Sequence, residues 1–291
     1  MVFYNNSLDM QKKLEKALME LSQEIDSDLK DFLSVSWLSY PNGLENKPDG
    51  TSWAAQRLFY PADLVSLFYA VAIEIWLQRQ WLEEDIELQR AMNEMAFMAS
   101  RDATSMVIDY LTGTASGPKI HNQSKYNWYE QRQLLNNWLS ELDWPELIGV
   151  NVSQKLLSEG AFGRERQSCG IHYQNRNRLS TGAMIRLLHI IVSNSLPLLI
   201  TYQRIQYLFK LNFDINIDSS ESQSMSIWRT SKRGNSSYID KVVFNEVTYH
   251  KIIMARTKDQ VPNIIVIFNE NSKVFRDDYT VPTLINRLIT D

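Results

Sequence analysis

The sequence has one cysteine, Cys169, among its 291 residues, so it can form no internal disulfide. It also lacks a run of apolar residues approaching the roughly 20 that a helix needs to span a bilayer. The first residues contain neither the basic stretch nor the apolar stretch of a secretory signal. We therefore expect a cytoplasmic protein with no membrane partner.

An excess of charge of one sign is also missing. The 30 lysine and arginine residues stand against 34 acidic ones, for a formal net charge of −4, and the basic residues are scattered. Proteins that bind nucleic acid concentrate basic residues in a patch or stripe, so we expect no nucleic-acid partner.

Motifs for cofactors are missing too. There is no Walker loop and no G-x-G-x-x-G sequence. Nothing pairs with Cys169, and no metal-ligand spacing connects the four histidines, His121, His172, His189 and His250. We expect no metal and no cofactor.

The sequence has ample apolar residues, 44% of the total, and their spacing changes along the chain. A helical spacing of three and four predicts an amphipathic helix that begins near Ser7 or Asp9 and buries Leu14, Leu18, Leu21 and Ile25. Alternation from Leu33 to Trp37 then predicts a half-buried strand, and a second short strand is expected at residues 52–58.

The middle of the chain is helical by pattern, and the last third is strand-like. A helix that is apolar on nearly every face begins at Pro61 and is expected to lie inside the globule. Further helices are expected at residues 85–98, 103–111, 128–142 and 181–192. Strands are expected at residues 225–232, 238–247, 249–255 and 263–268, followed by a helix at 280–289.

This order predicts an α+β fold. An antiparallel sheet would be built from both chain ends and flanked by helices, with an all-helical lobe inserted between its two parts. The expected sheet lobe comprises residues 1–60 and 212–291, and the expected helical lobe comprises residues 61–211, in one compact two-lobed unit.

Several stretches within this layout are similar to the class A β-lactamases and the penicillin-binding proteins. Residues 59–69 resemble the segment that carries Ser-x-x-Lys at the start of the central helix, and residues 100–113 resemble the Ser-Asp-Asn region. Further similar stretches are residues 151–155, 159–166, 175–181 and 231–234. The resemblance covers residues 33–268 and implies the fold of these serine hydrolases.

The resemblance also implies that the nucleophile is lost. In this family the serine attacks a carbonyl and forms an acyl-enzyme, but Asp63 stands in the place of the serine and Ser66 in the place of the lysine. A carboxylate that attacked an amide would give a mixed anhydride, which is too reactive to be a useful intermediate. We instead expect Asp63 to cap the helix, worth about 1 kcal/mol, and Ser66 to bond the backbone.

The second motif differs in the same way. Ala99 stands where the family has a serine, Ser100 takes the second position, and Arg101 replaces the asparagine. Ala99 has no hydroxyl to pass a proton to a leaving nitrogen. Arg101 is expected to be solvated or to pair with Asp102 or Asp109.

Some polar positions of the family are retained. Lys232 and Gly234 agree with the Lys-Thr/Ser-Gly motif, although Arg233 replaces the hydroxyl residue, and a lysine on an edge strand also prevents strand pairing. Glu165 is the best candidate for the loop carboxylate that orients water, or it is a surface residue paired with its neighbours Arg164 and Arg166.

The leading hypothesis is a catalytically inactive, β-lactamase-like binding or regulatory protein, whose partner is a protein or a small anionic or peptide ligand. The ligand candidates are Asp63, Ser66, Ser100, Arg101, Glu165, Lys232, Arg233 and Gly234. The alternative is a serine hydrolase with non-standard catalytic residues, using Ser66 or Ser100 with Glu165 or Lys232. A scaffold protein whose cleft has no role is a third possibility.

Overall fold

The chain divides into two compact units. The computed structural model describes residues 3–25, 28–157, 160–194, 203–211, 213, 228–233, 236–244, 249–271 and 279–289, with the backbone alone at 122–124, 228–233 and 236–244. The sheet unit comprises Met1–Phe59, Ser180–Pro197 and Thr201–Asp291, and the helical unit comprises Tyr60–Leu179 and Leu198–Ile200. Among the described residues, no helix combines the length and the apolar character that crossing a membrane requires.

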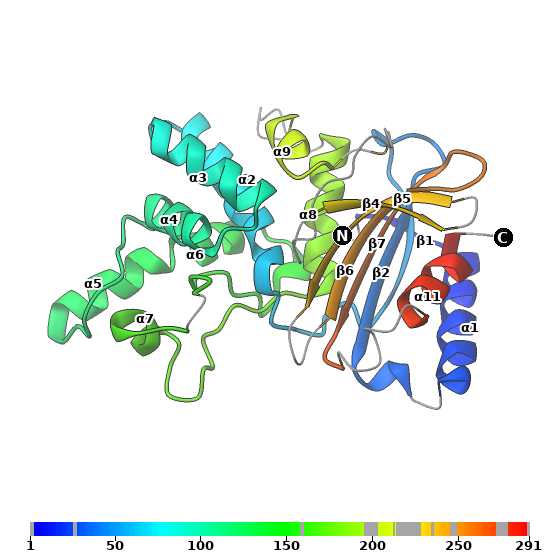
Figure 1. Cartoon of the computed structure of the whole chain (residues 1–291), viewed down its shortest axis with the longest axis horizontal. Helices are drawn as coiled ribbons and strands as arrows, with labels where there is room; N and C mark the ends of the chain where they lie inside the picture. Colours follow the sequence, from blue (N-terminus) through cyan, green and yellow to red (C-terminus); the bar gives the residue numbers. More distant parts are fainter. Residues whose placement is uncertain are drawn as a thin grey trace. The chain divides into compact units, whose positions relative to one another are not determined.

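The sheet unit contains one seven-stranded sheet in the order β1-β3-β2-β7-β6-β5-β4 (Figure 1). Its strands are β1 (Asn5–Asn6), β2 (Leu33–Ser39), β3 (Asp49–Trp53), β4 (Trp228–Arg233), β5 (Ser236–Phe244), β6 (Tyr249–Arg256) and β7 (Pro262–Asn269). All neighbours pair antiparallel except β1 and β3, which are parallel. The prediction of an α+β fold with a sheet built from both chain ends is confirmed, and β1 is an element that no sequence pattern indicated.

Strand β3 ends earlier than the strand predicted at residues 52–58. The chain leaves the strand conformation at Ala54, whose φ is +51°. Its carbonyl accepts a hydrogen bond from Ser34 Oγ at 2.9 Å. This left-handed residue turns the chain, so residues 54–58 continue as turns and loop rather than as a strand.

Strand β2 is buried on both faces, which corrects the expectation of a half-buried strand. Its alternating residues Leu33, Val35 and Trp37 belong to the hydrophobic core. The residues between them, Ser34 and Ser36, are equally buried. Their hydroxyls lie 2.6 and 3.0 Å from Thr181 Oγ1, so these polar side chains are buried with partners.

One face of the sheet is covered by the first and last helices, α1 (Leu8–Glu24) and α11 (Thr280–Ile289), which lie side by side in Figure 1. The Ser7 hydroxyl caps α1 by accepting a hydrogen bond from Met10 N, as predicted. Leu14, Leu18 and Leu21 pack with residues of α11, β2, β6 and β7 in one core cluster. The leucine spacing therefore located this helix correctly.

Helix α8 (Thr181–Ser193) belongs to the sheet unit, as does α9 (Gln203–Leu208). We expected the helical lobe to continue to residue 211, but the unit boundary lies at 179/180. The physical reason is local: Ser180 caps α8 by accepting from Ala183 N, and the next residue, Thr181, bonds to two serines of β2. Helix α8 thus starts on the sheet.

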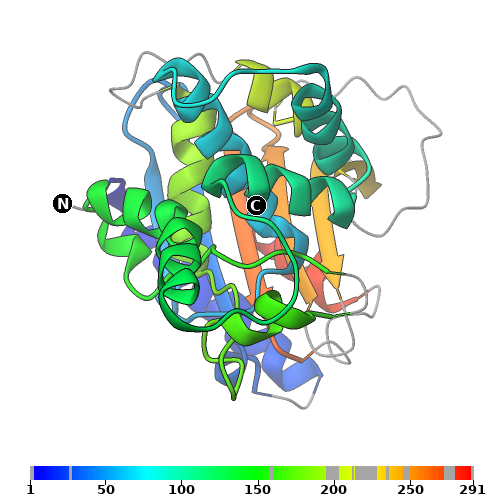
Figure 2. The same cartoon turned by 90° about the vertical axis from the view of Figure 1, so that its left-hand side faces the viewer.

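The helical unit contains α2 (Ser66–Gln78), α3 (Ile86–Phe97), α4 (Arg101–Thr112), α5 (Asn122–Arg132), α6 (Leu134–Glu141) and α7 (Gly163–Ser168) (Figure 2). Short 3-10 turns occur at Ala62–Val65 and Pro145–Leu147, and a third, Leu29–Asp31, lies in the sheet unit. The predicted interior helix is confirmed, because nearly every side chain of α2 is buried.

The single helix predicted at residues 128–142 is two helices. Helix α5 starts earlier, at Asn122, and the chain breaks at Gln133 before α6 begins. The residues on the two sides of the break are buried in different surroundings. Arg132, at the end of α5, is fully buried among polar groups. Trp138, in α6, packs edge-on against Trp76, with 5.6 Å between the ring centroids.

Candidate binding site

The turn before α2 carries the residue that replaces the family's nucleophile. Asp63 lies inside the 3-10 turn Ala62–Val65, where no side chain makes a capping hydrogen bond. Its Oδ1 instead lies 3.7 Å from Nε of Arg101, the first residue of α4. Asp63 is thus an acidic residue of the first turn, as expected, in a turn without the expected capping hydrogen bond. Arg101 is exposed, as one of its two expectations had it, but it pairs with Asp63 and not with Asp102 or Asp109.

The two candidate serines are engaged by backbone groups. Ser66 Oγ donates to the carbonyl of Asp63 at 2.7 Å, which is the backbone bond expected for this residue. Ser100 caps α4, where its Oγ accepts from Ala103 N at 3.2 Å. Neither hydroxyl has a lysine, histidine or carboxylate partner among the described hydrogen bonds.

Strained backbone flanks the Asp63–Arg101 pair on both sides. Ala62 has a φ of +46° and Ala99 a φ of +48°, in the left-handed region that L-residues with a Cβ rarely adopt. Such residues cost of order 1–3 kcal/mol each and cluster at functional sites. The strain supports treating this corner of the helical unit as a site.

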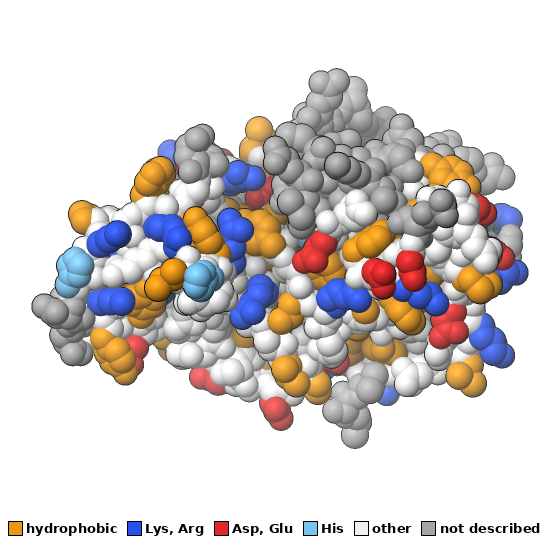
Figure 3. Space-filling model, turned by 90° about the horizontal axis from the view of Figure 1, so that it is seen from below, with side chains coloured by type: hydrophobic (Ala, Val, Ile, Leu, Met, Phe, Trp, Pro, Cys, Tyr) orange, Lys and Arg blue, Asp and Glu red, His pale blue; other side chains and the backbone are white. Residues whose placement is uncertain are grey.

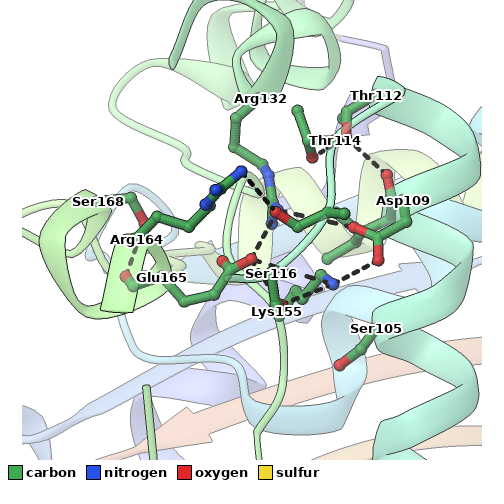
Figure 4. A network of polar contacts seen from close by, with 12 residues as sticks. Ser105, Asp109, Thr112, Thr114, Ser116, Arg132, Lys155, Arg164, Glu165 and Ser168 are labelled. Atoms are coloured by element: carbon green, nitrogen blue, oxygen red, sulfur yellow. Dashed lines mark hydrogen bonds and ion pairs between the residues drawn. The ribbon is translucent and has the colours of Figure 1, made fainter. Parts of the chain in front are cut away.

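A second, deeper group of charged residues contains Glu165 (Figure 4). Glu165 is 2% exposed, and its Oε1 accepts from Arg132 Nη2 at 2.8 Å and from Ser116 Oγ at 2.9 Å. Arg132 itself is 0% exposed. The expectation of a surface residue paired with Arg164 and Arg166 is therefore wrong, because Glu165 points inward and its partner is 33 residues away in the chain.

Lys155 and Asp109 complete this group, which we call the buried network and which comprises Asp109, Ser116, Arg132, Lys155 and Glu165. Arg132 and Glu165 lie at its buried centre, whereas Asp109 is half-buried and Ser116 is exposed at its edge. Lys155 Nζ lies 2.5 Å from Asp109 Oδ2, 3.0 Å from Ser116 Oγ and 4.0 Å from Glu165 Oε1. Burial raises the pKa of Asp109 above its usual range, against the lowering effect of Lys155 and Arg132. The two cations balance the two carboxylates, as buried charges require.

Helix α7, which carries Glu165, depends on a glycine at its first position. Gly163 has a φ of +53°, and a Cβ there would lie 2.0 Å from the carbonyl oxygen of Gly117. The following residue, Arg164, donates its N–H to that same carbonyl at 3.0 Å. This close approach joins α7 to the loop that holds Ser116.

Replacing Gly163 with alanine should therefore destabilise the protein by more than about 1–3 kcal/mol, the cost of left-handed strain alone, because the backbone clash adds to it. Gly160→Ala is the matched control: its φ is also positive, at +87°, but nothing lies within 4 Å of the added Cβ. Chemical denaturation measures both, and equal losses would contradict the role of the contact with Gly117.

Beside the Asp63–Arg101 pair lies a group of aromatic and basic side chains that the sequence analysis missed. The Arg176 guanidinium lies 5.3 Å from the ring centroid of Tyr60 and 4.7 Å from that of Tyr173. One tyrosine followed by two arginines within residues 173–178 was the only sequence signal for it.

The candidates from the third motif remain predictions. Lys232 and Arg233 end β4, the outermost strand in the described sheet, where their backbones pair with Ser237 and Ser236. Their side chains and the whole of Gly234 lie outside the described residues. Among the described residues, no group of three or more histidine, cysteine or acidic side chains could hold a metal ion.

Comparisons of sequence gave no match, neither to a protein-family model nor to a curated protein. Comparison of structures gave many. A β-lactamase from Chitinophaga pinensis matches with a TM-score of 0.58 and 12% identity, covering 97% of each chain. The TLA-3 extended-spectrum β-lactamase matches with a TM-score of 0.55 and 10% identity, covering 92% of this chain and 97% of that one.

The structure of PBP-A matches as well, with a TM-score of 0.52 and 10% identity over 99% of this chain and 96% of that chain. These matches cover nearly the whole of both chains, at identities that sequence comparison does not detect. The chain therefore has the fold of the β-lactamases and of penicillin-binding proteins such as PBP-A.

Proposed function

We propose that the protein is a β-lactamase-like binding or regulatory protein that does not form an acyl-enzyme. One observation carries the proposal: an aspartate stands in the turn before α2, where the resemblance places the nucleophile, and it is paired with Arg101 at 3.7 Å. The guanidinium compensates the negative charge of the carboxylate at this position. A group in that state binds cations and N–H donors, and it does not acylate.

The surrounding hydroxyls support the proposal. Ser66 would need a base to become a nucleophile, but it donates to a carbonyl one turn before it. Ala99 supplies no proton carrier. The resemblance to an acylating enzyme is thus one of fold, and the polar groups at this corner suit recognition of a ligand.

The alternative, a serine hydrolase with relocated residues, has one candidate in the described structure. The exposed Ser116 lies within hydrogen-bond distance of both Lys155 and Glu165. However, Lys155 also donates to Asp109 and Glu165 also accepts from Arg132, so both are engaged in ion pairs. We interpret Ser116 as a bridge within the buried network.

Incubation with benzylpenicillin and with a fluorophosphonate, followed by intact-mass measurement, tests the proposal. The parent should show no mass increase and no hydrolysis of nitrocefin. The variant Asp63→Ser/Ser66→Lys/Ala99→Ser, which restores the family's groups, should acquire a penicilloyl adduct.

An adduct on the parent would end the proposal. A fluorophosphonate adduct that disappears in Ser116→Ala would establish the relocated hydrolase, whereas one that persists in that variant and disappears in Ser66→Ala or Ser100→Ala would assign the nucleophile to those positions.

A further inference from the structure

Three arginines in the segment 160–178 differ in how their guanidinium groups are used. Arg164 donates to the carbonyls of Pro118 and Ala115, and Arg166 donates to those of Gly170 and Ile171. The guanidinium of Arg176 makes no hydrogen bond and no ion pair within the described part of the chain. It is also exposed to solvent. All five of its N–H donors are thus available to a ligand.

Two aromatic rings hold this unbonded guanidinium in place. It lies 5.3 Å from the Tyr60 ring and 4.7 Å from the Tyr173 ring, within the range of a cation–π interaction at each. The Tyr173 ring has a second cationic neighbour, because the Arg166 guanidinium lies 4.0 Å from its centroid. Arg166 is anchored to two carbonyls, so it supports Tyr173 and leaves Arg176 as the available cation.

The backbone that carries Arg176 is held by the side-chain amides of two asparagines. Asn151 Nδ2 donates to the carbonyls of Asn175 and Arg176 at 2.8 and 3.1 Å. The next residue, Asn177, is 1% exposed and bonds to Gln154 through both its amide oxygen and its amide nitrogen. A cation on such a backbone loses little conformational freedom when it binds, which is the benefit of preorganisation.

The charges around Arg176 define the charge of the ligand. Asp63 and Arg101 neutralise each other as an ion pair. Tyr60 stays neutral, since burial raises its pKa and Asp63 adds to this effect, against the lowering effects of Arg176 and Arg101. Arg166 and Arg176 remain as uncompensated cations around Tyr173, and because the Arg166 guanidinium donates to two carbonyls, Arg176 is the one of the two whose donors match a single carboxylate. Lysine and arginine side chains gather over the helical unit at the left of the face in Figure 3.

We propose that Arg176 binds the carboxylate of a small molecule that carries one negative charge and an apolar or aromatic body. The planar fork of a guanidinium matches a carboxylate in a two-bonded geometry. The body of the ligand has apolar surface to contact nearby, because Tyr173 is 42% exposed and Ile171 is 81% exposed. This inference rests on the proposed function and names the ligand class of the same corner of the helical unit.

Titration of the full-length protein with N-benzoylglycine, followed by calorimetry or ligand-observed NMR, tests the inference. The parent should bind N-benzoylglycine and should bind its uncharged amide at least tenfold more weakly. Arg176→Gln should raise the dissociation constant for the carboxylate at least tenfold. Arg178→Gln is the matched control, since Arg178 is also exposed and unpaired in the described residues, and it should bind as the parent does.

The inference would be overturned by no binding of N-benzoylglycine to the parent, by equal binding of its amide, or by an equal loss in Arg178→Gln. Tighter binding of inorganic phosphate than of N-benzoylglycine would also overturn it, because it would assign Arg176 to phosphate. The role of Arg176 and the proposed function are tested by different measurements. A covalent adduct of the parent with benzylpenicillin or the fluorophosphonate contradicts the proposed function. The dissociation constants for N-benzoylglycine decide the role of Arg176 whether or not such an adduct forms.

Discussion

Replacing Arg132 with methionine is expected to lower the free energy of unfolding by about 3–5 kcal/mol, the loss that follows when one partner of a buried ion pair is removed. The reason is that Glu165, at 2% exposed, would keep a buried charge without its 2.8 Å partner. The variant would also lose the stacking of the guanidinium on Trp128, 4.5 Å away. Equilibrium unfolding in urea, followed by tryptophan fluorescence, measures the change.

Two further variants make this result specific. Arg132→Met/Glu165→Leu removes both charges of the pair, so it should recover much of the stability that the single variant loses. Arg164→Met, one residue from Glu165, removes a guanidinium that donates to the carbonyls of Pro118 and Ala115 and pairs with no carboxylate in the described part of the chain, so it should cost about 1 kcal/mol or less. A loss below 1 kcal/mol for Arg132→Met itself would show that the network contributes little.

Acidification from pH 6.5 to pH 4 should remove about 3 kcal/mol of stability through His189 alone. Burial lowers the pKa of this histidine from 6.5 to about 4, and Arg186 acts in the same direction. The unfolded chain therefore binds a proton at His189 in this range while the folded chain does not. The contribution is fully present above pH 6.5 and is lost as the pH falls toward 4.

The contacts of His189 explain why it stays neutral. Its Nδ1 lies 3.2 Å from Tyr40 Oη, and its ring is stacked on Phe3 at 5.3 Å between centroids. His189→Phe keeps the stacking and removes the titration, so the stability difference between parent and variant should shrink as the pH falls from 6.5 to 4. Parallel curves for parent and His189→Phe would refute the prediction.

Periodicity was sufficient where an element is built from local apolar spacing. The leucines of α1, the alternation in β2 and the all-apolar α2 each produced the correct element type. Periodicity was insufficient where a neighbour decides the outcome. The burial of Ser34 and Ser36 depends on Thr181, which no pattern within β2 can reveal.

The candidate site was predictable to a smaller degree for the same reason. The resemblance identified Asp63 and Arg101 as replacements, but only the three-dimensional structure shows that they pair. Glu165 was selected from its loop, and its burial could not be anticipated because its partners Arg132, Lys155 and Ser116 come from separate segments. Arg176 was missed because its two tyrosines stand 116 and 3 positions before it (176 minus 60 and 176 minus 173).

The pairing of β2 with β7 affects the order of folding. Trp37 Nε1 donates to Asn263 Oδ1 across 226 residues of sequence, and the strands around them are neighbours along their whole length. During synthesis on the ribosome, β2 can pair with β3 early, but it emerges long before β7 exists, so one of its two edges must wait for its partner strand. Contacts this distant in sequence slow folding, so the early chain is the stage at which we expect this protein to depend most on chaperones.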